Sequence, residues 1–318
     1  MRIQHNIAAL NSYRNLGVNN SGVAKNVEKL SSGYRINRAG DDAAGLAISE
    51  KMRSQITGLE TATKNANDAV SLVQTAEGAL TEVHSMLNRM VELATQSANG
   101  IYEEVDRNAL QDEVNALTAE INRIADGTNF NKLNLLDGSL SKAGIEIKEG
   151  GSLTSVEKIG GATGTTENTA PAKRGKPLNL QIGDTNQPHN KIDLEIVDMH
   201  ADALGINFVE NATELDKNGI NIKTAEKAGF AIKHINEAIN CVSTQRGKLG
   251  AVQNRLEHTI NNLEVNTENM TAAESRIRDV DMAKEMMAYT KNNILVQASQ
   301  AMLAQANQVP QGVLQLLQ

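Results

Sequence analysis

An uninterrupted alternation of apolar residues three and four positions apart runs from Leu59 to Ala94. The positions are Leu59, Ala62, Ala66, Ala69, Val73, Ala76, Leu80, Val83, Leu87, Met90 and Ala94. Such spacing keeps an apolar stripe, which we call the seam of the helix, facing one partner along a left-handed supercoil. A helix over this stretch is about 54 Å long, so it cannot bury the stripe against itself. The sequence predicts a long helix that packs against other long helices, from this chain or from neighbouring copies.

Two further stretches with the same apolar spacing predict partner helices for this one. The shorter one, predicted over 103–125, follows the helix-stop pair Asn99-Gly100 and is expected to fold back antiparallel. The longer one begins after Thr224, a suitable N-cap. Its apolar positions are Ala228, Ile232, Ile235, Ile239, Val242, Leu249, Leu256, Ile260, Leu263, Met270 and Ile277.

Both ends of the chain are also predicted to be amphipathic helices. The first covers residues 3–30, and Gly17, Asn19 and Gly22 weaken its interior, so it should fold only with a partner. The last carries Met282, Met286, Tyr289, Val296 and Leu303 at heptad spacing and is predicted to break at Pro310. The two ends are expected to lie side by side.

The middle of the chain changes period. Apolar residues alternate with period two at 145–147, 178–182 and 192–196, which predicts short strands, with 183–190 as a hairpin loop. The predicted fold is therefore mainly α: a long antiparallel helical coiled-coil bundle with paired N- and C-terminal helices and a small β-rich elaboration at about 139–222. The expected domains are residues 1–44 plus 276–318, and residues 45–275.

Composition argues against several function classes. The net charge is −7 without a basic block, which disfavours nucleic acid binding. The sequence contains no run of 18 apolar residues, so no membrane-spanning helix is predicted. The six histidines include no pair three or four apart, and no phosphate loop or nucleophile motif is convincing, so neither an enzyme nor a metal or cofactor is predicted. The single cysteine, Cys241, is expected to be a semi-buried, inert thiol.

Three segments resemble one family. The stretch 30–48 reads LSSGYRINRAGDDAAGLAI, residues 92–100 read ELATQSANG, and residues 304–311 read AQANQVPQ. Together these strongly resemble the signature of bacterial flagellin, and the similarity covers about residues 1–140 and 225–318. The resemblance implies a structural subunit that polymerises into the flagellar filament used for motility, with the paired chain ends forming an inner coiled-coil tube and the longer helices an outer layer.

The same resemblance implies partners and a location. The chain would be exported, without a cleaved signal, to an extracellular filament. Its partners would be a chaperone that holds the C-terminal helix before export and the junction and cap proteins of the flagellum. It also implies a surface read by the Toll-like immune receptor of animals, which carries over to Arg89, Leu93 and Glu113. Those residues would equally serve filament packing, and Asn88 departs from the Gln usual in the family pattern.

Self-association is expected to use the apolar seams. The residues assigned to subunit packing are Ile3, Ile7, Leu10, Val27, Leu80, Leu87, Ile260, Leu263, Met286, Val296 and Leu303. Two alternatives remain open: a hook–filament junction or cap component of the same appendage, and a helical binding module that does not polymerise. Loss of assembly on deleting the last helix would distinguish a filament subunit from such a module.

Overall fold

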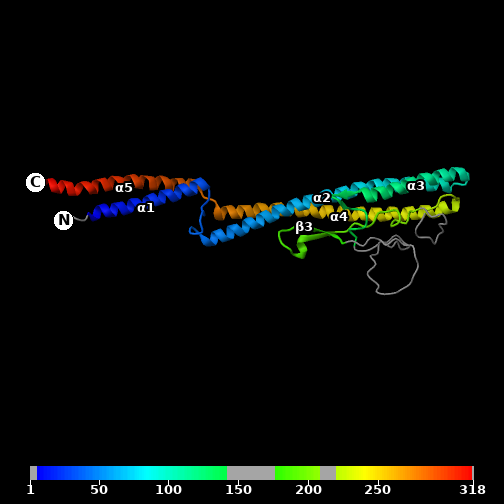
Figure 1. Ribbon diagram of the computed structural model, residues 1–318, viewed down its shortest axis with the longest axis horizontal. Helices are drawn as coiled ribbons and strands as arrows, with labels where there is room; N and C mark the ends of the chain where they lie inside the picture. The colour runs from blue at the N-terminus through cyan, green and yellow to red at the C-terminus, as the bar shows by residue number, and fades with distance from the viewer. Residues whose placement is uncertain (1–5, 142–175, 208–219, 317–318) are drawn as a thin grey trace, which may run out of the picture. The chain divides into compact units, whose positions relative to one another are not determined.

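The computed structural model describes residues 6–141, 176–207 and 220–316, with side chains up to residue 308. Five helices account for most of the described chain: α1 (Ile7–Ser32), α2 (Ala43–Ala98), α3 (Glu104–Gly127), α4 (Ala225–Arg278) and α5 (Met282–Leu316) (Figure 1). The chain forms two compact units. We call Met1–Thr57 with Val265–Gln318 the terminal unit, and Gly58–Glu264 the central unit.

The central unit is built on the predicted seam of α2. From Ala62 to Ala94 every seam position of this helix is buried, and Leu59 is half-buried. The seam packs with Val114 and Ile121 of α3 and with Ile235, Val242 and Leu249 of α4 in one continuous core. The prediction that the alternating three- and four-residue spacing packs these three helices together is confirmed.

The short strands lie against this core. Strand β3 (Leu178–Gln181) pairs antiparallel with β4 (Lys191–Leu194), and the predicted loop between them contains a 3-10 turn, Pro188–Asn190. Ile182 and Ile192 pack on Ala66 and Ala69 of α2 and Leu256 of α4. Gly183 is required here, because a Cβ atom at this position would meet the Asn190 side chain at 2.2 Å. The hairpin is therefore fixed onto the helices by close packing.

One hairpin was not predicted. Strand β1 (Asn129–Phe130) pairs with β2 (Leu133–Asn134) directly after α3, ahead of the β-rich region expected at 139–222. Its two turn residues, Asn131 and Lys132, have φ of 50° and 65°. A two-residue hairpin with two positive φ angles is normally signalled by Asn-Gly, and Lys132 does not give that signal. The strand predicted around 145–147 lies outside the described residues.

In the terminal unit, α1 and α5 run side by side and antiparallel (Figure 1). Asn19 Nδ2 of α1 donates to Ser299 Oγ of α5 at 2.9 Å. At Gly22 the two helices approach closely, because a Cβ atom there would lie 3.1 Å from Asn292. The pairing of the two chain ends is thus confirmed, and two of the three weak positions of the first helix, Asn19 and Gly22, lie against α5, whereas a Cβ atom at Gly17 would meet nothing within 4 Å.

A compact junction joins the helices of this unit. Backbone hydrogen bonds connect the segment after α1 with the end of α4, from Arg35 N to Arg278 O (2.7 Å) and from Val280 N to Gly33 O (3.0 Å). The Arg278 guanidinium lies 4.7 Å from the centre of the Tyr34 ring and 2.7 Å from Glu50 of α2. Gly33 ends α1 in the left-handed conformation, at φ 75°.

These contacts place the division between the units deeper in the helices than the sequence suggested. It falls at 57–58 in α2 and 264–265 in α4, rather than at 44–45 and 275–276. The first turns of α2 belong with the terminal unit because Glu50 pairs with Arg278 and because Gly45 lies against Ile36. Asp42 caps the first turn of α2 by accepting a hydrogen bond from Gly45 N at 2.8 Å.

The predicted break at Pro310 is wrong. α5 continues through this residue to Leu316. A proline removes one helical hydrogen bond, here the bond to the carbonyl of Ala306. That carbonyl instead accepts a hydrogen bond at 2.7 Å from the side chain of Asn6, at the start of α1.

His200 ties the segment after β4 to α3 in the central unit. Its Nδ1 lies 2.5 Å from Asp198 Oδ1 and its Nε2 lies 3.1 Å from Asp126 Oδ1 near the end of α3. Burial lowers the pKa of His200, but the hydrogen bonds and charges of Asp198 and Asp126 outweigh it, so the pKa is raised. Protonated His200 therefore stabilises the attachment.

We expect this contribution to be fully present below the pKa of an unfolded histidine, about 6.5, and to be lost as pH rises through the raised folded pKa. His200→Gln should lack it, so the difference in unfolding free energy between wild type and variant, measured by urea denaturation, should shrink above about pH 6.5. His258→Gln, which removes an exposed histidine of α4, is the control. If the difference in unfolding free energy between wild type and His200→Gln grew with rising pH, the stabilising role of protonated His200 would be contradicted.

Candidate functional site

The candidate site is the apolar surface of the two terminal helices. On α1 the exposed side chains are Ile7, Leu10, Tyr13, Val18 and Val27, and on α5 they are Met282, Met286, Met287, Ile294, Leu295 and Met302. Ile7 and Leu10 are each 61% exposed, and Met287 is 67% exposed. We call these eleven residues the terminal apolar surface. Contiguous exposed apolar side chains of this kind mark interaction sites.

The terminal unit has little core of its own. Among its described residues, Ile36 is the one apolar side chain that is fully buried, and it lies in the loop before α2 rather than between α1 and α5. The buried residues of the α1–α5 pair are polar, Asn26 and Ser299. Burial of apolar area is the main stabilising contribution to folding, so this helix pair gains little of that stabilisation within the single chain.

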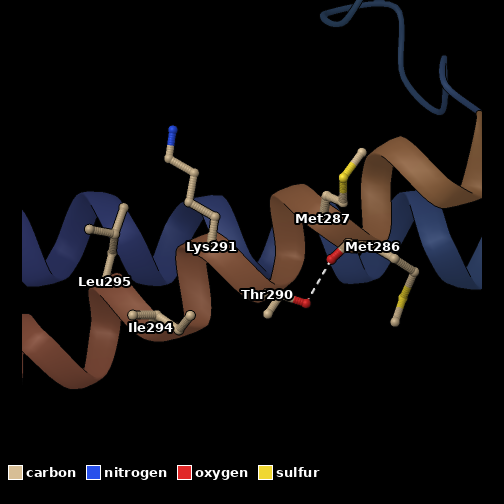
Figure 2. Close-up of a pocket in the computed structure, with 6 residues that line it drawn as sticks. All are labelled: Met286, Met287, Thr290, Lys291, Ile294 and Leu295. Carbon is tan, nitrogen blue, oxygen red and sulfur yellow. Dashed lines mark hydrogen bonds between the residues drawn. The ribbon is translucent and has the colours of Figure 1, made fainter.

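A shallow depression of about 510 Å³ lies within this surface. Its lining residues are Met286, Met287, Thr290, Lys291, Ile294 and Leu295, all from α5. Figure 2 shows Met286 and Met287 extending in different directions around the helix, so the apolar surface continues around α5. Thr290 Oγ1 bonds back to Met286 O at 2.9 Å, which satisfies the hydroxyl without an outside partner. Lys291 is the charged residue beside the depression.

The residues assigned to subunit packing occupy different environments. Ile7, Leu10, Val27 and Met286 are exposed, Val296 and Leu303 of α5 and Ile260 of α4 are half-buried, and Ile3 lies outside the described residues. Leu80 and Leu87 have no exposed surface, and Leu263 is also buried. These three contribute to the core of the single chain, because α3, α4 and the β3–β4 region already cover the central seam. Among the described residues assigned to subunit packing, the exposed ones therefore all lie on α1 and α5.

A second exposed cluster lies where α2 faces α3. Arg89 is 2.9 Å from both Glu92 of α2 and Glu113 of α3. The hydrogen bonds that Arg89 donates to Glu113 and, to a smaller extent, to Glu92 raise the pKa of Arg89, so the guanidinium stays charged. The structure therefore brings together Arg89 and Glu113, as expected from the sequence, and adds Glu92 to the cluster.

Leu93, the third residue expected in this cluster, is 1% exposed and belongs to the central core. The family resemblance had implied that Leu93 belongs to the same receptor-binding surface as Arg89. The contact with α3 widens the buried face of α2 beyond the seam, so Leu93 is covered while Arg89 remains at the edge. Leu93 positions the cluster through packing and offers no surface of its own.

The described residues provide no metal site, and the single cysteine is unreactive. Within residues 6–141, 176–207 and 220–308, no group of three or more His, Cys, Asp or Glu side chains is arranged to hold a metal ion. Cys241 is buried, and burial raises the pKa of its thiol to about 11, which keeps it protonated and unreactive. Among the helices in the described part of the chain, none has a stretch long and apolar enough to cross a membrane.

Asn6 and Asn19 are contact residues that the sequence analysis did not identify. Asn6 bonds to the backbone of α5 at Ala306, and Asn19 bonds to Ser299 and, at 3.4 Å, to Leu295 O. The sequence carried one signal, the cluster of Gly and Asn in an otherwise apolar helix. Small and polar residues at that position indicate a close helix partner rather than only a weak helix.

A packed helical unit joined in one chain to a helix pair with exposed apolar faces is the arrangement of a structural subunit completed by association. Comparisons with known proteins agree. Residues 3–141 match the family model described as the bacterial flagellin N-terminal helical region, and residues 232–317 match the bacterial flagellin C-terminal helical region.

Full-length relatives extend the match. Flagellin of Bacillus subtilis (strain 168) is 54% identical over 330 aligned residues, which cover 100% of both chains. Flagellin of Clostridium tyrobutyricum is 46% identical, covering 98% of this chain and 100% of the relative. The flagellar filament 33 kDa core protein of Treponema phagedenis is 47% identical, covering 100% of both.

The chain belongs to the bacterial flagellins. It is a structural, self-polymerising subunit of the flagellar filament, an extracellular appendage. Of the functions considered from the sequence, the filament subunit is the one these relatives support, and neither a junction or cap component nor a non-polymerising binding module is needed to explain the fold.

Proposed function

We propose that the terminal apolar surface of α1 and α5 is where neighbouring copies of this chain contact one another in the filament. The observation that carries the proposal is the unequal distribution of buried apolar side chains. They fill the central unit, whereas Ile36 is the one fully buried apolar side chain in the described part of the terminal unit. Contacts between different faces of identical subunits do not close and generate a helical filament, which suits exposed residues on several sides of the helix pair.

We expect Leu10→Asn and Met286→Gln to reduce filament growth strongly, because each places a polar group of similar size on a surface that must lose water. Val265→Asn is the matched control: Val265 is 56% exposed on α4, inside the terminal unit but outside α1 and α5. The measurement is seeded growth followed by light scattering and negative-stain microscopy.

The control should grow like wild type, and all three variants should keep the wild-type urea unfolding of the central unit. Equal growth of Leu10→Asn, Met286→Gln and the control would show that neighbouring copies contact one another through a different surface.

Before assembly, another protein must bind the same apolar surface to keep it from water. We propose that an export chaperone binds α5 through Met286, Met287, Ile294 and Leu295, and that the chain is exported without removal of a signal peptide. At the filament ends, junction and cap proteins would take the place of neighbouring copies on the terminal helices. Methionine side chains suit a surface with several partners, because they are flexible and adapt to different shapes.

Met287→Gln should weaken binding of the flagellin export chaperone from the same organism in isothermal titration calorimetry, since a polar amide then replaces the thioether in the contact. Val265→Asn again serves as the control. Undiminished binding by Met287→Gln, Met286→Gln and Ile294→Asn together would show that the chaperone does not use this face of α5.

A second proposal concerns the Arg89 cluster. We infer that Arg89, with Glu92 and Glu113 beside it, contacts the animal Toll-like receptor for flagellin in the monomer, while Leu93 supports the cluster from the core. An exposed arginine with fixed carboxylate partners is pre-organised for recognition, and arginine is frequent at the energetic centre of interfaces.

Arg89→Ala monomers should lose affinity for the receptor ectodomain in surface plasmon resonance with the urea midpoint of the central unit unchanged. Leu93→Ala should lower the unfolding free energy of that unit by about 2–5 kcal/mol, as for a buried leucine. Arg123→Ala, which removes a similar surface ion pair with Glu120 on α3, is the control. Receptor affinity of Arg89→Ala equal to that of Arg123→Ala would refute the proposal.

A further inference from the structure

Pro310 lies inside a continuous helix. α5 extends beyond it to Leu316, so the residue is not a helix terminus. Proline has no backbone N–H, and therefore the carbonyl four residues earlier, at Ala306, loses its helical donor. Ala306 is half-buried, and a shielded carbonyl without a donor is costly. The helix can continue through Pro310 at low cost only if another group donates to Ala306 O.

Asn6 supplies that donor from the other end of the chain. Its Nδ2 donates to Ala306 O at 2.7 Å, and its Oδ1 accepts from Ala9 N at 3.1 Å. Both halves of the amide are thus used. The oxygen caps the first turn of α1, and the nitrogen takes the place of the N–H that Pro310 lacks in α5. A serine or aspartate would serve the first role equally well, but only a side chain with a suitably placed donor serves both.

We propose that Asn6 and Pro310 act as a coupled pair that makes the last turns of α5 conditional on the docking of α1. With α1 docked, Ala306 O has its donor and the helix continues. With α1 undocked, the proline leaves Ala306 O unpaired and the helix beyond it loses stability. No apolar side chain of α1 or of the described part of α5 is fully buried, so this polar contact carries particular weight in the terminal unit.

The consequence is an internal check on folding. The complete α5 forms only when both ends of the same chain are together, so a chain with one end displaced does not offer the full length of its C-terminal helix to other molecules. This inference concerns the folding of one chain, and it does not depend on which residues contact a neighbouring copy.

A double-mutant cycle tests the coupling directly. The variants are Asn6→Ser, Pro310→Ala and the double variant, each assembled into filaments of the full chain. The Asn6→Ser variant keeps an N-cap oxygen, but its side chain is too short to reach across to α5. The Pro310→Ala variant restores the backbone N–H that donates to Ala306 O. The readout is amide hydrogen exchange of residues 307–316, and Asn15→Ser, at an exposed asparagine of α1, is the control.

We expect Asn6→Ser to raise exchange in this segment about fivefold, the change that corresponds to one net hydrogen bond. In the Pro310→Ala background the same substitution should change exchange by less than about twofold, because Ala306 O already has a donor. An equal effect of Asn6→Ser in both backgrounds, or no effect in either, would overturn the proposal.

If Asn6→Ser filaments do not form, recovery of assembly by Pro310→Ala supports the coupling, and failure of Pro310→Ala to restore assembly contradicts it. The eleven residues of the terminal apolar surface are unchanged in all these variants, so the result is separate from the test of that surface.

Discussion

Burial of the alternating apolar seam of α2 is the interaction on which the central unit depends. Positions from Ala62 to Ala94 are covered by α3, α4 and the segments around β3 and β4, which leaves this unit with a complete core. The terminal unit lacks an equivalent. α1 and α5 are joined by close approach at Gly22 and by the amides of Asn6 and Asn19, while their larger apolar side chains remain exposed. One chain thus combines a unit with an extensive apolar core and a unit whose larger apolar side chains are mostly exposed.

This division between a packed unit and an exposed helix pair suits a filament subunit. Its function lies in the difference between surface that is covered within the chain and surface that is left for other copies. Under our proposal the same exposed residues of α5 are covered by a chaperone before assembly and by neighbouring subunits or end proteins after it. The Arg89 cluster, by contrast, sits on the packed unit, where its geometry is fixed in the single chain.

Periodicity predicted the helices well because it reports directly on burial, and the caps at Asp42 and Thr224 confirmed where two of them begin. Features that depend on distant partners were missed. The break expected at Pro310 does not occur because the compensating donor is at the other end of the chain. Leu93 was expected at the surface, but the contact with α3 buries it. The β1–β2 turn uses Asn131-Lys132 without glycine, so local turn chemistry gave no warning.

The central claim is that α1 and α5 lack a core in the single chain and gain one on assembly. Amide hydrogen exchange of the full-length protein, compared between monomer and filament, tests it most directly. The account predicts fast exchange in α1 and α5 of the monomer, strong protection of both helices in the filament, and slow exchange along Ala62–Ala94 of α2 in either state. Terminal helices protected in the monomer as strongly as the α2 seam would contradict it.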